Sequence, residues 1–189
     1  MRVVAGKYGS RPLKAVPGQN TRPTTDKIKE SIFNLLGSRC HSGIVLDLYG
    51  GTGGLAIEAV SRGMDHAVIC EKHRAAIATI KHNIEITKET ERFTLLAGDN
   101  YVSLKKYQTA HPTVIFDLVL IDPPYKREKI VEDIKWLAQL GLINQDTIIM
   151  CETDNETTLS ETIDQWSKYR EKHYGLTVIH LYEWEDEVE

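Results

Sequence analysis

The sequence of 189 residues predicts an α/β fold whose β-sheet is mostly parallel. From residue 43 onward, short runs rich in Val, Ile and Leu alternate with segments of helical periodicity. Strands that alternate with helices indicate crossover connections, which place parallel strands in one sheet covered on both faces. Two strand-like segments near the end of the chain meet at Tyr174-Gly175, which indicates a closing antiparallel pair.

A short basic hairpin is expected before this alternation begins. The segments 2–5 and 11–16 flank the turn-prone residues Gly6-Lys7-Tyr8-Gly9-Ser10. We therefore expect a basic N-terminal β-hairpin extension over residues 1–22, followed by the main domain over residues 23–189.

A helix is expected next, after the loop Pro17-Gly18-Gln19-Asn20. Thr24, Thr25 or Asp26 can cap this helix, which should run to about Ser38. Its apolar residues form one stripe that we expect to pack on the main domain: Ile28, Ile32, Leu35 and Leu36.

The main domain contains the repeated strand and helix patterns. Strands are expected near residues 44–49, 67–71, 93–98, 115–121 and 146–152. Helices are expected near residues 53–63, 73–87, 100–107 and 127–140. Beyond residue 152 the patterns predict a helix near 158–167 and two strands, near 168–174 and 177–184. The predicted sheet therefore has seven strands and an antiparallel final strand.

Composition and cysteine usage exclude several classes of protein. Hydrophobic residues make up 41% and charged residues 26% of the chain, as in an ordinary globular protein. No apolar stretch reaches membrane-spanning length and no signal-peptide pattern is present, so we expect a cytoplasmic protein without a membrane partner. Cys40, Cys70 and Cys151 are far apart, and the seven histidines show no metal-ligand spacing, so we expect neither a disulfide framework nor a metal site.

The net charge of −4 conceals an uneven distribution. Residues 1–39 carry eight Lys or Arg against two acidic residues, a balance of +6, which leaves −10 for the rest of the chain. A basic end on an acidic body favours a directed contact with a polyanion such as nucleic acid. The alternative is a solvated surface with an uneven charge.

The segment Asp122-Pro123-Pro124-Tyr125 follows an apolar run over residues 116–121 that reads as a buried strand. Because proline has no N–H group, the strand ends here and its carbonyl groups are free to accept other hydrogen bonds. These groups suit a planar ring that bears an exocyclic amine. Asp122 and the Pro123 carbonyl would accept its N–H groups while Tyr125 stacks on its face. The alternative is an Asp-Pro turn with a half-exposed tyrosine.

A glycine-rich loop, Gly50-Gly51-Thr52-Gly53-Gly54, connects the first strand to a helix. Glycine permits positive φ angles and the close approach of a ligand to a helix N-terminus. Gly51-x-Gly53-x-x-Ala56 matches the dinucleotide-binding pattern, with Glu71 placed to bind a ribose. The same residues suit S-adenosylmethionine, and Glu71 can also be an exposed strand-end carboxylate. The glycines do not choose between the two ligands.

Three features favour S-adenosylmethionine. Asp47 stands in an otherwise apolar strand, where a buried carboxylate needs the loop amides or the cationic amino end of a methionine moiety as a partner. A pyrophosphate would be repelled by it. Asp99 closes the third repeat, where an adenine amine can donate to it, although Asp-Asn is also a common helix cap. The chain is also short for the separate substrate domain that hydride-transfer enzymes usually carry.

Taken together, these segments resemble the RsmD-type family of bacterial methyltransferases, which modify guanine N2 in small-subunit ribosomal RNA. The resemblance covers nearly the whole chain and is most specific in Arg22-Pro23-Thr24-Thr25-Asp26 combined with Asp122-Pro123-Pro124-Tyr125. It also includes residues 6–13, 30–34, 47–53 and 58–63, together with Glu71, Asn83 and Asp99. Departures from the family pattern are Gly50 for alanine, Tyr49 for phenylalanine and Ser10 for glycine.

The resemblance implies a Rossmann-like class I methyltransferase fold and an S-adenosylmethionine-dependent 16S rRNA (guanine-N2)-methyltransferase. The residues that would hold the cofactor are Asp47, Tyr49, Gly51, Gly53, Glu71 and Asp99. The amine would attack the methyl group in line, assisted by Asp122, Pro123 and Tyr125. The residues that would contact RNA phosphates are Arg2, Lys7, Arg11, Lys14 and Arg22, although Arg22 can equally brace its own loop over the cofactor. The expected partner is 16S ribosomal RNA, either free or within an assembling small ribosomal subunit.

Other functions share parts of this pattern. An amino-methyltransferase that acts on adenine in DNA or RNA would use the same tetrapeptide, whereas enzymes that modify glutamine usually show Asn in place of Asp122. A catalytically silent RNA-binding module would not need the acidic residues at the strand ends. A nucleotide-dependent oxidoreductase has no use for Asp122-Pro123-Pro124-Tyr125.

Overall fold

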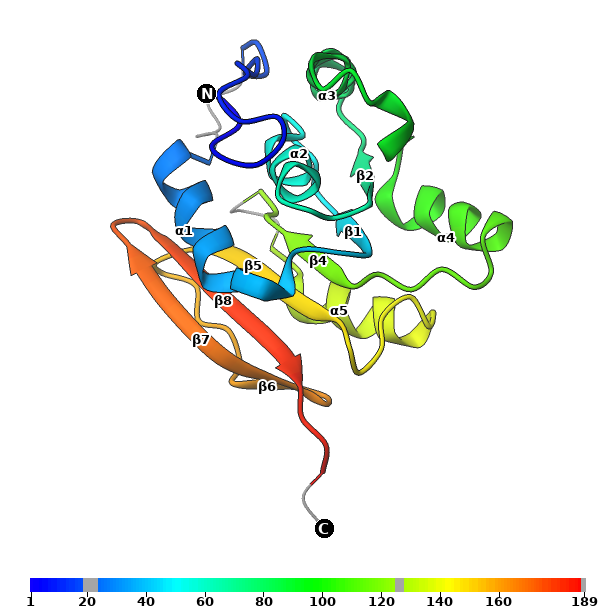
Figure 1. The fold of residues 1–189 in the computed structure, drawn as a ribbon. Helices are drawn as coiled ribbons and strands as arrows, with labels where there is room; N and C mark the ends of the chain where they lie inside the picture. The colour runs from blue at the N-terminus through cyan, green and yellow to red at the C-terminus, as the bar shows by residue number, and fades with distance from the viewer. Residues whose placement is uncertain (19–23, 125–127, 188–189) are drawn as a thin grey trace.

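An eight-stranded mixed β-sheet forms the centre of the molecule (Figure 1). The computed structural model describes residues 1–18, 24–124 and 128–187. The strand order is β3-β2-β1-β4-β5-β8-β7-β6. The five parallel strands are β1 (Ile44–Asp47), β2 (His66–Glu71), β3 (Phe93–Ala97), β4 (Leu118–Ile121) and β5 (Ile148–Asp154). Antiparallel pairing joins β5 to β8 (Thr177–Trp184), β8 to β7 (Trp166–Tyr174), and β7 to β6 (Thr162–Ile163).

Helices cover both faces of the parallel strands. The α-helices are α1 (Asp26–Leu36), α2 (Gly54–Ser61), α3 (Arg74–Ile86), α4 (Asn100–Ala110) and α5 (Ile130–Gln139). Two short 3-10 helices, η1 (Gly37–Arg39) and η2 (Thr90–Arg92), follow α1 and precede β3. None of the helices in the described part of the chain is both long and apolar enough to cross a membrane.

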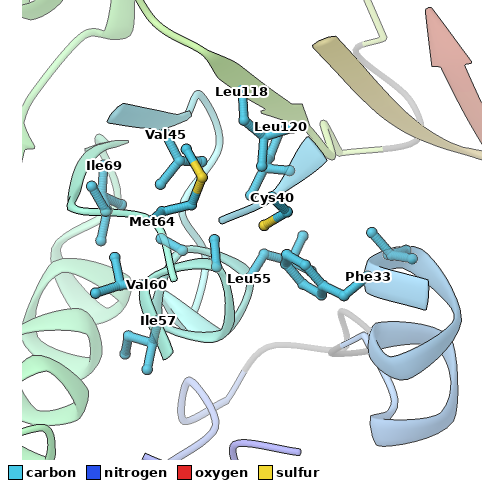
Figure 2. Close-up of a cluster of buried hydrophobic side chains, with 14 of the residues drawn as sticks. Phe33, Cys40, Val45, Leu55, Ile57, Val60, Met64, Ile69, Leu118 and Leu120 are labelled. Carbon is cyan, nitrogen blue, oxygen red and sulfur yellow. The ribbon is translucent and has the colours of Figure 1, made fainter. Parts of the chain in front are cut away.

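Alternate residues of each strand supply two separate cores, because successive side chains in a strand point to opposite faces. Val45 and Leu118 belong to the core beneath α1, α2 and α3, and Figure 2 shows them with Phe33 of α1. Their neighbours Leu46 and Val119 belong to the other core, which contains α4 and α5. The predicted mostly parallel sheet, covered on both faces, is therefore confirmed.

The helix predicted near residues 158–167 is wrong, and this is where the eighth strand arises. The short strand β6 turns directly into β7 through Asp164 and Gln165, and Asp164 adopts a φ of 51°. Leu159, Ile163 and Trp166 have the spacing of a helical stripe, yet they are buried without a helix: Leu159 precedes the hairpin, and Ile163 and Trp166 belong to it. Apolar residues at this spacing can be buried by either structure, so the pattern alone misled the prediction.

The N-terminal segment folds as a short, irregular hairpin. A single β-bridge, between Arg2 and Pro12, joins its two arms within residues 1–18. The backbone amides of Val4 and Ala5 instead donate to the buried Glu58 of α2, at 2.7 and 3.0 Å. The amides of Val3 and Leu13 donate across the two arms to the Arg11 and Met1 carbonyls, both at 3.0 Å. Glu58 therefore ties a short two-armed segment to the domain. The expected boundary at residues 22 and 23 lies outside the described residues.

Candidate active site

The carboxyl ends of the parallel strands gather acidic side chains at one edge of the sheet. Asp47 ends β1 and Glu71 ends β2, while Asp122 directly follows β4. Asp99 lies two residues beyond β3, and Glu152 lies near the end of β5. Ligands of open α/β sheets bind at this edge, so the predicted acidic residues belong to one candidate site.

The glycine loop turns sharply from β1 into α2. Gly51 and Gly53 adopt positive φ angles of 59° and 78°, and Gly53 is the N-cap of α2. A residue with a side chain would be strained at both positions. The positive φ angles that the sequence predicted for this tight turn are therefore confirmed.

Asp47 is a buried carboxylate without a hydrogen-bond partner among the described residues. Burial, together with the nearby charges of Asp122 and Glu71, raises its pKa to about 8. The backbone amides of Tyr49 and Ala56 offset a small part of this effect. A buried acceptor of this kind lacks a donor, and a cationic donor would satisfy it best.

Glu71 holds the glycine loop against β2. One carboxylate oxygen accepts from the Gly51 amide at 2.8 Å, and the other accepts from the amides of Lys72 and His73 at 2.8 and 2.9 Å. Glu71 is therefore not an isolated strand-end carboxylate. The oxygen that accepts from Gly51 keeps a further lone pair with which it can accept a ligand hydroxyl.

Asp99 and Tyr49 also form hydrogen bonds within the protein. Asp99 is exposed and caps α4 by accepting from the Val102 amide at 3.0 Å. The Tyr49 hydroxyl donates at 2.6 Å to the buried Asp133 of α5, which also accepts from Tyr101. Tyr49 therefore offers only its ring to the predicted cofactor contact.

Asp122 is held by a neighbour that the sequence did not single out. Its carboxylate lies 3.5 Å from the Thr24 hydroxyl, which in turn lies 3.3 Å from the carboxylate of Glu152. Burial raises the pKa of Asp122 to about 6, and hydrogen bonds with Glu152 and Thr24 limit the rise. Pro123 is buried beside it. Tyr125, the predicted stacking residue, lies outside the described residues.

Sequence reasoning named Thr24 as a possible helix cap and as part of the segment 22–26, but gave it no role beside Asp122, and it did not name Glu152. Thr25, not Thr24, caps α1 by accepting from the Ile28 amide at 3.2 Å. The signal for Glu152 was present, because it follows the apolar run Ile148–Cys151 in the same way that Asp122 follows its strand. For Thr24 the resemblance singled out the segment, but its place beside Asp122 depends on long-range packing.

The predicted RNA-binding residues are distributed over the N-terminal segment, and three of them have partners within the molecule. Arg2 pairs with Asp26 at 3.3 Å, and Lys7 pairs with Glu89 at 2.8 Å. Arg11 donates to the Ile86 and Thr87 carbonyls at 3.1 and 2.7 Å. Lys14 is exposed. Arg22 lies outside the described residues.

The strand order and the acidic strand ends define a class I methyltransferase fold. A family model described as "Conserved hypothetical protein 95" matches residues 1–183. This match, together with the relatives described below, shows that the chain belongs to the RsmD-type family.

Individual relatives cover almost the entire chain. The "Putative rRNA methyltransferase YlbH" of Bacillus subtilis (strain 168) is 38% identical over 182 residues, which are 96% of this chain and 98% of that protein. The "Ribosomal RNA small subunit methyltransferase D" of Escherichia coli (strain K12) is 30% identical over 97% of this chain and 89% of its own. A solved structure, a conserved hypothetical protein of Streptococcus pyogenes, shares 43% identity with a TM-score of 0.75 and covers 83% of this chain and 95% of its own.

Proposed function

We propose that this protein transfers a methyl group from S-adenosylmethionine to the exocyclic N2 amine of a guanine in 16S ribosomal RNA. The observation that carries the proposal is the proximity of two acidic residues with different surroundings. Asp47 is buried without a hydrogen-bond partner in the described structure, and Asp122 is close enough to raise its pKa. One carboxylate suits a charged methyl donor, and the other suits an amine acceptor beside it.

The residues around the glycine loop fit S-adenosylmethionine. The partnerless carboxylate of Asp47 would accept from the cationic amino group of the methionine moiety. Glu71 would accept from the ribose hydroxyls, and Asp99 would accept from the adenine amine. Gly51 and Gly53 allow the backbone to come close to the ligand. When bound, the cofactor supplies a methyl group on a positively charged sulfur.

Asp122 and Pro123 would hold the amine that receives the methyl group. The lone pair of a guanine amine is delocalised into its ring, so this nitrogen is a weak nucleophile. Hydrogen bonds from its N–H groups to the Asp122 carboxylate and the Pro123 carbonyl would favour a pyramidal nitrogen and stabilise its developing positive charge. Orientation of the two reactants can contribute roughly 7–11 kcal/mol more.

The base must leave its stack before it reaches this pocket, at a cost of a few kcal/mol. Tyr125 of the tetrapeptide would offset part of this cost by stacking on the base. Single-stranded or loop RNA, free or in an assembling small ribosomal subunit in the cytoplasm, is the natural substrate for such a pocket.

The basic N-terminal segment would contact RNA phosphates. Lys14 is exposed, and the Arg2–Asp26 and Lys7–Glu89 pairs are also open to solvent. Exposed pairs of this kind contribute only about 0–1 kcal/mol. A phosphate can therefore replace Asp26 or Glu89 as the partner at little cost.

The test uses S-adenosylmethionine with a labelled methyl group and small subunits from bacteria that lack their own enzyme of this family. Mass analysis of the nucleosides should show N2-methylguanosine with the wild-type protein. Asp122→Ala should abolish the transfer, while its affinity for S-adenosylhomocysteine stays within a few-fold. The exposed Asp146→Ala is the matched control and should behave as wild type.

Other outcomes point to other functions. Methylated adenine in place of guanine would identify an adenine amino-methyltransferase. RNA binding without methyl transfer at any base would identify a silent binding module. Unfolding of Asp122→Ala, with loss of cofactor binding, would show that this residue is structural.

A further inference from the structure

Asp122 shares its environment with a second carboxyl group, that of Glu152. Glu152 is only 4% exposed and lies near the carboxyl end of β5, beside β4 in the sheet. The Thr24 hydroxyl stands between the two, 3.3 Å from Glu152 and 3.5 Å from Asp122. Three chain segments that are distant in sequence therefore bring three oxygen-bearing side chains together.

Counting hydrogen atoms shows that this arrangement needs one more proton. A threonine hydroxyl can donate only one hydrogen bond, although it can accept others. If both carboxyl groups were ionised, Thr24 could satisfy only one of them, and two like charges would face each other in a buried site. Neither carboxylate forms an ion pair with a cation of the described residues.

Other charged groups nearby do not neutralise the Asp122 and Glu152 carboxylates. Asp47, on β1, is a further carboxyl group and supplies no positive charge. On α1, the buried Lys29 is engaged by Glu58 and by the Arg2 carbonyl. On β8, His180 lies opposite Cys151 and contacts Thr153, so it lies on the other face of the sheet from Glu152.

We propose that Glu152 is a positioning residue for Asp122: the two carboxyl groups share one proton, Glu152 is the neutral acid, and Thr24 bridges them. Glu152 then donates to the Asp122–Thr24 pair and aims an ionised Asp122 at the amine. This inference rests on the proposed function for its consequence in catalysis, but the proton sharing itself does not.

The electrostatics agree with this division of roles. Burial, together with the Asp122 charge, raises the pKa of Glu152 well above its usual value. Burial also raises the pKa of Asp122, but hydrogen bonds with Glu152 and Thr24 limit the rise to about 6. These directions favour a neutral Glu152 beside an ionised Asp122.

The decisive variants are Glu152→Gln and Glu152→Ala, with the exposed Glu156→Gln as the matched control. The amide of Gln keeps a donor toward Asp122, so the single-turnover methylation rate at pH 7 should stay within a few-fold of wild type. Ala removes the donor, and the rate should fall about ten- to a hundredfold. The wild-type rate should decline at alkaline pH, when Glu152 loses its proton. Glu152→Gln should lack that decline and keep the acid limb that Asp122 causes.

Thr24 provides a second pair of variants. Thr24→Ser retains the hydroxyl and should behave nearly as wild type, whereas Thr24→Val removes it and should slow the reaction. The inference is overturned if Glu152→Gln is as slow as Glu152→Ala at every pH, or if the wild-type and Glu152→Gln pH profiles superimpose. Equal losses for Thr24→Ser and Thr24→Val would equally overturn the bridge.

An activity-independent measurement separates this inference from the proposed function. Carboxyl groups of glutamate labelled with carbon-13 can be followed by NMR during a pH titration, and the resonance missing from Glu152→Gln identifies Glu152. We expect it to titrate well above the usual range of glutamate, even if no RNA is methylated. Titration in the usual range would refute the shared proton, whatever the enzyme does.

Discussion

The side-chain amide of Asn83 on α3 donates to the backbone carbonyl of Thr52 in the glycine loop at 2.8 Å. The same side chain accepts from the Lys14 amide at 2.8 Å and donates to the Lys14 carbonyl at 3.0 Å. Asn83 has no exposed surface. One buried residue thus joins the N-terminal segment, α3 and the candidate cofactor loop.

Asn83→Ala should lower the free energy of unfolding by about 2–4 kcal/mol, because backbone groups of Thr52 and Lys14 lose their buried partner. It should also weaken the binding of S-adenosylhomocysteine, since the glycine loop loses its tie to α3. Urea unfolding and calorimetric titration measure the two effects. The exposed Asn34→Ala is the control, and equal unfolding midpoints for the two variants would contradict the prediction.

Asp47→Asn should stabilise the ligand-free protein at neutral pH. A carboxyl group whose pKa rises from 3.8 to about 8 on folding favours the folded state less and less as the pH rises through this interval. At pH 7 the cost is about 4 kcal/mol. The variant should recover part of it, and its stability should depend less on pH between these values. Urea unfolding at several pH values tests this, with the exposed Asp146→Asn as the control. A variant less stable than wild type at pH 7 would show that Asp47 has a donor in the folded protein.

Binding of S-adenosylhomocysteine near pH 7 should release a proton. Asp47 is protonated below about pH 8 in the ligand-free protein, and a cationic amino group beside it would favour the ionised form. Calorimetric titration in buffers with different ionisation enthalpies reveals the number of protons released. Asp47→Asn should bind more weakly and release none. Identical heats in all buffers for the wild type would place the cationic group elsewhere.

Gly6→Ala should detach the N-terminal segment from the domain. Gly6 has a φ of 84°, and a Cβ atom there would lie 1.9 Å from the Ser61 carbonyl oxygen of α2. The neighbouring amides of Lys7 and Tyr8 donate to the Ser61 carbonyl and hydroxyl, both at 2.9 Å. Losing these contacts should cost roughly 2–4 kcal/mol and expose Lys7 and Arg11 to trypsin.

Gly18→Ala is the matched control for this experiment. Gly18 also has a positive φ, 70°, but a Cβ atom would meet nothing within 4 Å. Only the backbone penalty of about 1–2 kcal/mol should remain. If both variants resist trypsin equally, the contact with Ser61 does not hold the segment in place.

Much of the candidate site was predictable because it follows from local patterns in the sequence. Alternating strands and helices predict a parallel sheet, and parallel strands present their carboxyl ends at one edge. Asp47, Glu71 and Asp122 could therefore be placed together from the sequence alone. The positive φ angles of Gly51 and Gly53 also follow from residue type and loop position.

Three features could be predicted without the structure: the alternation of strands and helices, the glycine loop and the acidic edge of the sheet. Each of them depends on residues that lie close together in the chain. Only the tertiary structure decided that residues 162–174 form a hairpin, that Thr24 and Glu152 meet Asp122, and that Arg2, Lys7 and Arg11 have internal partners. These outcomes depend on which distant groups compete for the same apolar surface or hydrogen bond. The spacing of residues along the chain does not show which of these groups makes the contact.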